Sequence, residues 1–404
     1  MIKYIFIMLL SFMFTFPATA DDGEPSLIDL FGEEEKKEQV EKEREAPDLF
    51  SKAAKAEETQ KTESEEVKEE VDEKGMFSFL NFSFLRDKEK AKEFTRKDNE
   101  PKESYEERMT RLAEEGDTDA CLTLGYMYLY GEGGMQSDSE KAFKYYSMAA
   151  DKGDKIAMNN LGSLYYSGIG TQKDVRQAVK LFDEAAKLGN NEAAVNLAFI
   201  YLTSGATDNP TVKSTVVKLF NQAANGDNIT AQYMMGMIYY NGFGITKNDD
   251  KAFQMLRKAA TQYDEAQYQL ALRYMNAEGT PRNYGNAVAN LIKAAKQGHI
   301  PSMLWLGDIL AAGTSFPKNE YEAYVWYNIA SVYDAKNASE KRDMLEGKLK
   351  IEEVLQAQST AEKFKTQPTA ITDYVHKTFG VNLAEYVTEK APATTNKRDK
   401  KQTR

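Results

Sequence analysis

The sequence contains few of the residues that proteins most often use for catalysis and metal binding. Its 404 residues include one cysteine and two histidines, and the net charge is −11. Cys121 has no second cysteine to pair with, so an intrachain disulfide is excluded. Scarce cysteine and histidine argue against a zinc site, and the acidic balance argues against nucleic acid, whose phosphates attract clustered Lys or Arg. We expect no metal, no cofactor and no nucleic-acid partner.

Sequence motifs of common enzymes are also missing. The chain has no Gly-x-Ser-x-Gly, no His-Glu-x-x-His and no phosphate-binding loop ending in Gly-Lys-Ser/Thr. His299 lies in a link between two predicted helices, where an exposed polar residue is ordinary, and His376 lies near the C-terminus. Nucleophilic catalysis requires a nucleophile within reach of a base. We predict that the protein is not an enzyme.

Residues 1–20 resemble a secretory signal peptide. A lysine precedes the nearly uninterrupted apolar run Ile5 to Phe16, and Pro17 precedes the small-x-small site Ala18-Thr-Ala20. The run is shorter than the ~20 residues that a membrane-spanning helix needs. We predict cleavage after Ala20 and a periplasmic or secreted protein that begins at Asp21. An uncleaved N-terminal anchor is the alternative.

Residues 21–101 form a leader rich in Glu and Lys, with few apolar residues. Such a sequence cannot bury enough surface to offset the entropy of ordering, so we predict disorder. The apolar island 76–85, Met-Phe-Ser-Phe-Leu-Asn-Phe-Ser-Phe-Leu, interrupts it. Two interpretations of the island remain open. It contacts a partner, a membrane or the cell wall, or it folds back on the first helices that follow.

A helix-turn-helix pattern recurs about six times within residues 104–331. The stretch Ala157 to Gly189 shows it clearly, as two short amphipathic helices joined by Gly168-Ile-Gly170. A unit this small cannot bury its own apolar face, so the units must stack. The first helices share a five-residue motif: Leu124-Gly-Tyr-Met-Tyr128, Leu161-Gly-Ser-Leu-Tyr165, Leu197-Ala-Phe-Ile-Tyr201, Met235-Gly-Met-Ile-Tyr239, Leu270-Ala-Leu-Arg-Tyr274 and Leu306-Gly-Asp-Ile-Leu310.

Each residue type in the pattern has a mechanical role. Gly or Ala after the first motif residue lets the two helices of a unit approach closely, and paired alanines in the second helix do the same toward the next unit. Glycine in the turn adopts positive φ and ends the first helix. Ser104-Tyr-Glu-Glu107 fits a capping box. It predicts a half-unit that caps the open end of the stack.

The succession Ala-x-x-x-Leu-Gly-x-x-Tyr, Gly-x-Gly, Lys-Ala and Ala-Ala-x-x-Gly resembles the Sel-one-like repeat, a relative of the tetratricopeptide repeat. The resemblance covers residues 104–331 and implies an all-α fold, a right-handed α/α solenoid superhelix of about six helix-turn-helix repeats. Unit three departs most, with Ala198 for glycine and Val216 for the second-helix alanine. We expect this unit to bend or loosen the superhelix.

The C-terminal part is predicted to close the stack. Residues 332–366 form a capping region, expected as one long helix from Ser331 to about Lys365, similar to the terminal helix of related proteins. Residues 367–404 are expected to hold a short helix within 371–386 and a disordered basic tail. A solvated tail is the preferred interpretation, and contact with an anionic membrane or cell wall is the alternative.

In tetratricopeptide-like stacks the first helices line a concave face. If the motif takes the equivalent place here, aromatic and methionine side chains point into that groove, and exposed patches of this kind mark partner sites. The alternative is tight winding, which would bury these rings between neighbouring first helices. The proposed lining is Tyr126, Tyr130, Tyr166, Phe199, Tyr233, Met237, Tyr240, Tyr268 and Met275. A second register is formed by the tyrosines at the last position of the five-residue motif, and these are expected in the core: Tyr128, Tyr165, Tyr201, Tyr239 and Tyr274.

These observations predict an exported, monomeric, non-enzymatic scaffold, adaptor or regulator that binds a protein or peptide in its concave groove. The alternative function is an envelope hydrolase or a binder of cell-wall precursors and β-lactam-type ligands. Some cysteine-rich relatives of the repeat family are associated with penicillin binding, but this chain lacks their paired cysteines.

Overall fold

The computed structural model describes residues 104–204, 207–313, 316–333, 336–380 and 383–388. Within these ranges all regular elements are helices, and none of the helices is long and apolar enough to cross a membrane. The predicted solenoid of about six helix-turn-helix units is therefore confirmed. The signal peptide, the leader with its apolar island 76–85, and the basic tail lie outside the described residues.

Six pairs of helices follow the half-unit helix α5 (Tyr105–Glu115). The first helices of the units are α6 (Thr118–Tyr130), α8 (Lys155–Ser167), α10 (Asn191–Thr203), α12 (Ile229–Asn241), α14 (Asp264–Asn276) and α16 (Ile300–Ala312). The second helices are α7 (Ser139–Ala150), α9 (Val175–Lys187), α11 (Pro210–Asn225), α13 (Asp249–Ala259), α15 (Tyr284–Gln297) and α17 (Glu320–Val332).

Polar side chains and glycines define the ends of these helices. The capping box at α5 is confirmed, since Ser104 Oγ accepts the Glu107 N–H at 3.1 Å and Glu107 Oε2 accepts the Ser104 N–H at 2.7 Å. Asp or Asn caps each of the six second helices. Gly168, with φ of 72°, ends α8 in the left-handed conformation. The sequence signals and the observed helix ends therefore agree.

A backbone hydrogen bond that recurs in the stack fixes the turn inside a unit. In unit two the Asp174 N–H donates to the Tyr165 carbonyl at 2.8 Å, and in unit four the Asn248 N–H donates to the Tyr239 carbonyl at 2.9 Å. The bond joins the cap of a second helix to the last motif residue of the first helix. It places that residue at the turn edge of the stack.

The motif glycines stand where the two helices of a unit approach most closely. A Cβ atom built on Gly125 would lie 2.7–2.9 Å from three ring atoms of Tyr146, and one built on Gly236 would lie 2.7 Å from Leu256 Cγ. Tyr146 and Leu256 are fully buried, so neither can move aside without disturbing the core. Glycine is thus required at these positions by space rather than by backbone conformation.

We expect Gly125→Ala to destabilise the protein although alanine favours a helix. Overpacking against Tyr146 costs about 1–3 kcal/mol, which exceeds the gain of about 1 kcal/mol in helix propensity. Thermal unfolding followed by circular dichroism measures the change. The matched control is Gly285→Ala, where the new Cβ would meet only Asn283 Oδ1 at 3.4 Å. The close-approach explanation would be contradicted if both variants had melting temperatures equal to or above that of the wild type.

The C-terminal region is built differently from the prediction of one long helix. After α17 the chain forms α18 (Lys336–Glu346) and α19 (Ile351–Lys363). The two are separated at 347–350, where Gly347 follows α18 and Lys350 caps α19. The break lets α19 pack on α17, which a straight continuation could not do. The expectation of a single helix was therefore wrong.

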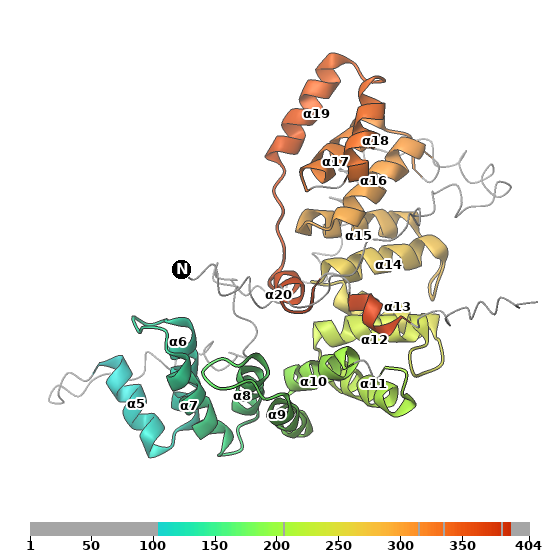
Figure 1. Ribbon diagram of the computed structural model, residues 1–404. Coiled ribbons are helices and arrows are strands. Elements are labelled where there is room, and N and C mark those ends of the chain that lie inside the picture. Colours follow the sequence, from blue (N-terminus) through green and yellow to red (C-terminus); the bar gives the residue numbers. More distant parts are fainter. Residues whose placement is uncertain (1–103, 205–206, 314–315, 334–335, 381–382, 389–404) are drawn as a thin grey trace, which may run out of the picture.

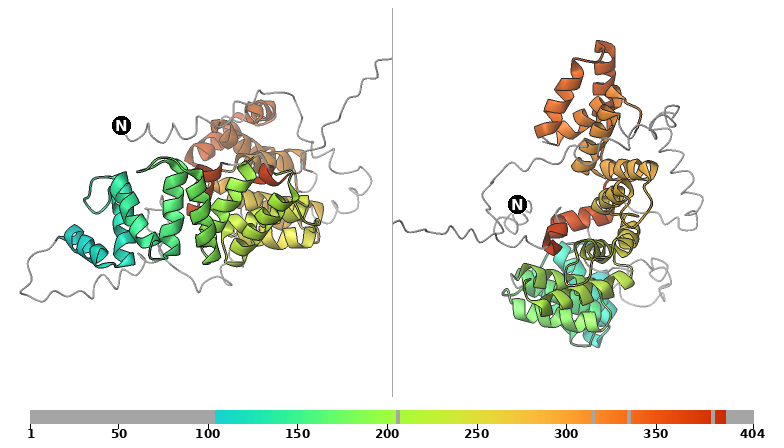
Figure 2. Two further views of the ribbon diagram at one scale, coloured as in Figure 1. Left: turned by 60° about the horizontal axis from the view of Figure 1, so that its bottom comes forward. Right: turned by 90° about the vertical axis from the view of Figure 1, so that its right-hand side faces the viewer.

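Two short helical elements follow α19 in the sequence and lie away from the end of the stack. Residues 364–369 are without regular structure, and α20 (Ala370–Phe379) and the 3₁₀-helix η3 (Leu383–Val387) come after them. Figure 1 shows the stack turning between α10 and α12, with α20 in the inner angle of that turn. Figure 2 shows the same placement from the side. The chain thus returns from the end of the stack to its inner face.

Candidate functional site

The inner face of the stack holds a segment of the chain's own C-terminus. We call residues 366–380 and 383–388 the docked segment. It lies across first helices that precede it by more than a hundred residues in the sequence, with η3 against α12 and α10. The contacts of this segment define which part of the inner face can hold a peptide.

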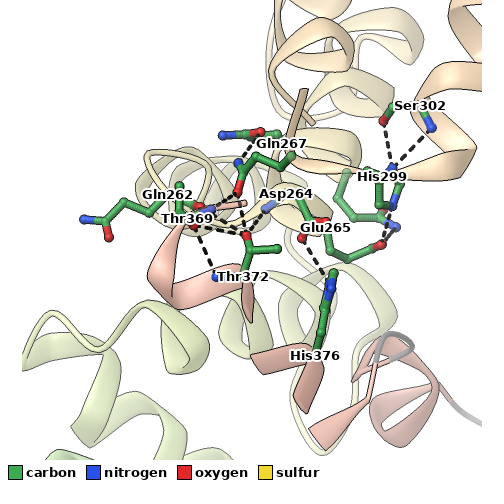
Figure 3. Close-up of polar contacts among 11 residues, drawn as sticks. Gln262, Asp264, Glu265, Gln267, His299, Ser302, Thr369, Thr372 and His376 are labelled. Atoms are coloured by element: carbon green, nitrogen blue, oxygen red, sulfur yellow. Dashed lines mark hydrogen bonds and ion pairs between the residues drawn. The ribbon is translucent and has the colours of Figure 1, made fainter. Parts of the chain in front are cut away.

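Hydrogen bonds fix the beginning of the docked segment (Figure 3). The Gln367 N–H donates to the Lys296 carbonyl at 2.7 Å. The Thr369 hydroxyl donates to the Gln262 carbonyl at 2.5 Å, and the same hydroxyl accepts the Thr372 N–H at 3.2 Å as the cap of α20. The start of α20 is therefore tied to the links on either side of unit five.

Thr372 is the centre of a buried polar relay. Its hydroxyl donates to Gln297 Oε1 at 2.7 Å and accepts the Asp264 N–H at 3.2 Å. Gln297 Nε2 in turn donates to Gln267 Oε1 at 3.0 Å. All of these side chains are buried. Buried polar groups need hydrogen-bond partners. Here Thr372 of the docked segment provides them for Gln297 and Asp264 of the stack, and is itself satisfied by them.

An ion pair joins the middle of α20 to the start of α14. His376 Nε2 lies 3.2 Å from Oδ1 of Asp264, a carboxylate with no solvent exposure. Burial opposes protonation of His376, but the hydrogen bond to Asp264 and the charges of Asp264, Glu265 and Asp373 outweigh it. They hold the His376 pKa above its ordinary value of 6.5. The protonated ring is therefore the form that the docked geometry favours.

Aromatic and aliphatic side chains complete the contact. The Phe379 ring stacks on Phe199 of α10 with centroids 4.1 Å apart, and Tyr386 meets the same ring edge-on at 5.9 Å. Val375, Leu383 and Val387 are fully buried. Burial raises the pKa of the Tyr374 phenol, and the charge of Glu192 on α10 adds to this. Phe199 is thus the main apolar contact point of the inner face.

The other histidine forms a second polar cluster beside the first. His299 Nδ1 lies 2.8 Å from Ser302 Oγ and accepts the Ser302 N–H, and its Nε2 lies 2.9 Å from Glu265 Oε2. The order Ser, His, acid is that of a catalytic triad. Ser302, however, has no solvent exposure, and His299 is the cap of α16. This cluster therefore fixes the junction of units five and six.

The expectation that His299 is an exposed link residue was wrong, because it is 7% exposed and holds two partners. Both histidines of the chain contact the consecutive acids Asp264 and Glu265. Across the described ranges, no three Asp, Glu, His or Cys side chains gather in a way that could hold a metal ion.

The docked segment buries fewer side chains than a unit of the stack does, although three of them belong to the same apolar cluster as side chains of α10 and α12. Among its described residues, the fully buried side chains are Thr372, Val375, Leu383 and Val387. Each buried aliphatic side chain contributes about 1.5–3 kcal/mol, and the cost of ordering the segment opposes this gain. Regions with few buried contacts open locally without unfolding of the whole protein. The segment therefore packs on the core as a bound peptide would, through a few buried side chains.

The residues proposed for the groove lining fall into two groups. The buried group is Tyr126, Phe199, Tyr233, Met237 and Met275. The half-buried group is Tyr130, Tyr166, Tyr240 and Tyr268. Two half-buried rings have cations over them: Lys173 Nζ lies 5.2 Å from the Tyr166 centroid, and the Arg273 guanidinium lies 3.6 Å from that of Tyr240. Of the whole set, Phe199 stacks directly with a ring of the docked segment.

The predicted contrast between the two tyrosine registers was wrong. Tyr233 was expected to line an open groove, but it is fully buried and meets Tyr263 edge-on at 5.0 Å. Tyr239 was expected in the core, but it is half-buried, and so are Tyr165, Tyr201 and Tyr274. Tight winding encloses the inner rings between neighbouring first helices, while the turn of each unit leaves the other register at the edge. Tyr128, at 5% exposure, is the member of that register that is buried.

Comparison with known families agrees with the repeat geometry. The family model described as Sel1 repeat matches residues 118–154, 155–190, 229–264, 264–299 and 300–331. The chain is a Sel1-repeat protein. The gap in these matches covers unit three, whose sequence departs most from the pattern. Its helices α10 and α11 nevertheless occupy their place in the stack.

Several solved structures resemble this Sel1-repeat protein in part. A Sel1 repeat protein from Oxalobacter formigenes is 28% identical and has a TM-score of 0.48, covering 56% of this chain and 91% of its own. A protective antigen of uropathogenic Escherichia coli with an SLR fold is 24% identical, with a TM-score of 0.44 and coverages of 72% and 68%. An immunity protein from Pseudomonas aeruginosa is 21% identical, with a TM-score of 0.33 and coverages of 54% and 83%. The comparison with curated proteins gave no match.

The sequence of this Sel1-repeat protein contains a signal for the docked segment in addition to the short helix that it predicts within 371–386. Pro368 precedes Thr369 and Thr372, which read as a helix start with a cap. Val375 and Phe379 follow at helical spacing. The pattern indicates an amphipathic helix that needs a surface to cover its apolar side. It does not indicate which surface, because that depends on how the stack curves.

The attachment of α20 should weaken as pH rises. Because the docked state raises the His376 pKa, its contribution is fully present below the ordinary value of 6.5 and is lost as pH rises through the raised value. Protease cleavage within 364–369 should therefore be faster at pH 8.5 than at pH 6. The expected pH dependence disappears in His376→Gln, which cannot be protonated. Cleavage rates equally pH-dependent in that variant would contradict the assignment to His376.

Proposed function

We propose that this Sel1-repeat protein is an exported scaffold that binds a helical segment of a partner protein on the inner face of its stack. Sel1-repeat solenoids are typical of protein–protein interaction scaffolds. The observation that carries the proposal is the docked segment. The inner face already holds about three turns of helix, α20, through a stacked ring, a buried hydroxyl relay and an ion pair.

The chemistry of this face is that of a peptide site rather than of a catalytic centre. It offers the Phe199 ring, the amide oxygen of Gln297 and the carboxylate of Asp264 within one stretch of the inner face. An amphipathic helix docked into an apolar groove is a common mode of peptide recognition. The half-buried rings of Tyr166, Tyr240 and Tyr268 extend the same set of first-helix positions along the stack.

Partner capture tests the binding part of the proposal. The full chain is used to capture proteins from the envelope fraction of the native host, together with the variants Phe199→Ala and Phe253→Ala. Phe253 is an equally buried ring, but it lies on second helix α13 and packs edge-on against Tyr274. A partner of the inner face is lost with Phe199→Ala and retained with Phe253→Ala. Equal recovery with both variants would contradict inner-face binding.

Export is the second part of the proposal, and it rests on the apolar run before Pro17 and the site Ala18-Thr-Ala20. We expect the protein isolated from its host to begin at Asp21 and to be found outside the cytoplasm. N-terminal mapping by mass spectrometry measures this. Recovery of an intact Met1 from the native host would favour an uncleaved anchor and contradict the cleavage.

A further inference from the structure

We propose that the docked segment is an exchangeable intramolecular ligand, which covers the inner face until a partner helix of the same chemistry displaces it. The inference deepens the proposed function and rests on it. It assigns to the C-terminus a role as competitor, and it states what kind of helix the partner must present.

The first argument is where the docked segment binds. Its hydrogen bonds reach Gln297 and Gln262, which lie 72 to 110 residues earlier in the chain. It is joined to α19 by residues 364 and 365, which have no regular structure, so no continuous helix from α19 dictates where α20 lies. A segment that crosses back over the stack to bind by side chains and hydroxyl groups binds as a tethered peptide would.

The second argument is that the docked segment buries little and leaves one side in water. Lys377 and Glu385 are exposed, and so are Gly380 and Thr388. The segment joins one apolar cluster of the stack through Val375, Leu383 and Val387, whereas the units bury entire helix faces along the described stack. Segments of low local stability open far more often than the core does. The docked segment can therefore leave the inner face while the stack stays folded.

The contacts define the partner helix. It begins with two hydroxyl residues three apart, because the Thr369 hydroxyl donates to the Gln262 carbonyl and the Thr372 hydroxyl donates to Gln297 Oε1. An aliphatic residue follows at the place of Val375 and an aromatic residue at the place of Phe379, above Phe199. The first helices α10 and α14 place the acids Glu192, Asp264 and Glu265 around α20. The charge of a cationic partner helix complements these acids, whereas an acidic helix is repelled by them.

Oδ2 of Asp264 is the atom at which a partner helix can gain a hydrogen bond that the docked segment does not make. Asp264 is fully buried, and its Oδ2 accepts no hydrogen bond among the described contacts, while Oδ1 faces His376. The histidine ring presents one N–H to this carboxylate. An arginine at that place can donate to both oxygens in parallel. We therefore assign to the partner helix an Arg where the docked segment has His376.

Tethering explains how the docked segment covers a site without blocking it permanently. A short link gives a tethered peptide a high effective concentration at its site, in the millimolar range for flexible links. The apparent affinity of a partner is reduced by the fraction of molecules in which the face is open. If the face is open in one molecule in a hundred, a variant in which the segment is released binds a partner helix about 100-fold more tightly than the wild type does.

The test uses a fluorescent synthetic peptide of residues 366–388 as the probe and the full chain as its receptor at pH 7. In Val375→Asp the charge introduced at a fully buried position should release the segment. We expect this variant to bind the probe at least tenfold more tightly than the wild-type chain. The matched control is Thr388→Asp, which adds the same charge at an exposed position of the docked segment and should behave as the wild type. A His376→Arg probe should bind the released variant about tenfold more tightly than the unmodified probe.

Amide hydrogen exchange of the wild-type chain gives a second test that needs no variant. Amides of α20 should exchange at least 100-fold faster than those of α12. Equal protection of α20 and α12 would overturn the inference, and so would equal probe binding by wild type and Val375→Asp, or binding by neither. These failures leave the proposed function to be judged by the separate capture of a partner with Phe199→Ala and Phe253→Ala.

Discussion

Replacing Tyr233 by alanine is expected to lower the free energy of unfolding by about 3–5 kcal/mol, as loss of a buried aromatic ring does. Tyr233 has no solvent exposure and packs against Tyr263, which in turn meets His376 of the docked segment at 6.0 Å. The ring therefore supports the inner face from beneath rather than lining it. Urea unfolding followed by circular dichroism measures the loss.

Two control variants separate ring packing from other effects. Tyr233→Phe keeps the ring and should cost less than about 1.5 kcal/mol. Tyr239→Ala removes a half-buried ring at the turn edge and should cost about 1–2 kcal/mol. A larger loss for Tyr239→Ala than for Tyr233→Ala would restore the register assignment that the sequence suggested and would contradict the burial seen here.

Removing the Phe199 ring is expected to weaken peptide binding about 30-fold, which corresponds to about 2 kcal/mol for a hot-spot ring. The effect is measured with the probe peptide 366–388 and the full-chain variant Val375→Asp as the reference receptor. Phe199 is the ring on which Phe379 stacks at 4.1 Å, so its loss removes the main apolar contact of the probe. The receptor is the double variant with Phe199→Ala.

The matched control for this effect is Phe253→Ala in the same background. Both rings are buried and both make an edge-on contact inside the stack, Phe199 with Phe220 and Phe253 with Tyr274. Their removal should therefore destabilise the stack by similar amounts. Probe affinity should fall for Phe199→Ala alone. A similar fall for both variants would show that binding follows stability and not the inner face.

The sequence predicted the repeat architecture well because its signals act within one unit or between neighbours. Leu161-Gly162 followed by Gly168-Ile-Gly170 requires a close helix pair and a tight turn, and Ser104 with Glu107 requires a helix start. Each of these signals depends on residues a few positions apart, and the structure has the helices where they place them. The repeat period then gives the stacking.

The candidate site could not be predicted to the same extent because it depends on the curvature of the stack and on contacts between distant residues. Which face of α12 is enclosed depends on small rotations between units, and tight winding placed Tyr233 inside. The contact of Thr372 with Gln297 joins residues 75 apart, and that of His376 with Asp264 joins helices α20 and α14, which share no sequence pattern. The break at 347–350, which contains Gly347, likewise follows from packing on α17.

The most direct test of the account is photocrosslinking of the probe to its receptor. A peptide of residues 366–388 carrying benzoylphenylalanine in place of Phe379 is irradiated with full-chain Val375→Asp, and the attachment point is mapped by mass spectrometry. The account predicts attachment on α10, at or next to Phe199, where the Phe379 ring stacks. Attachment confined to the second helices α9, α11 and α13 would contradict the claim that the inner face binds a helix.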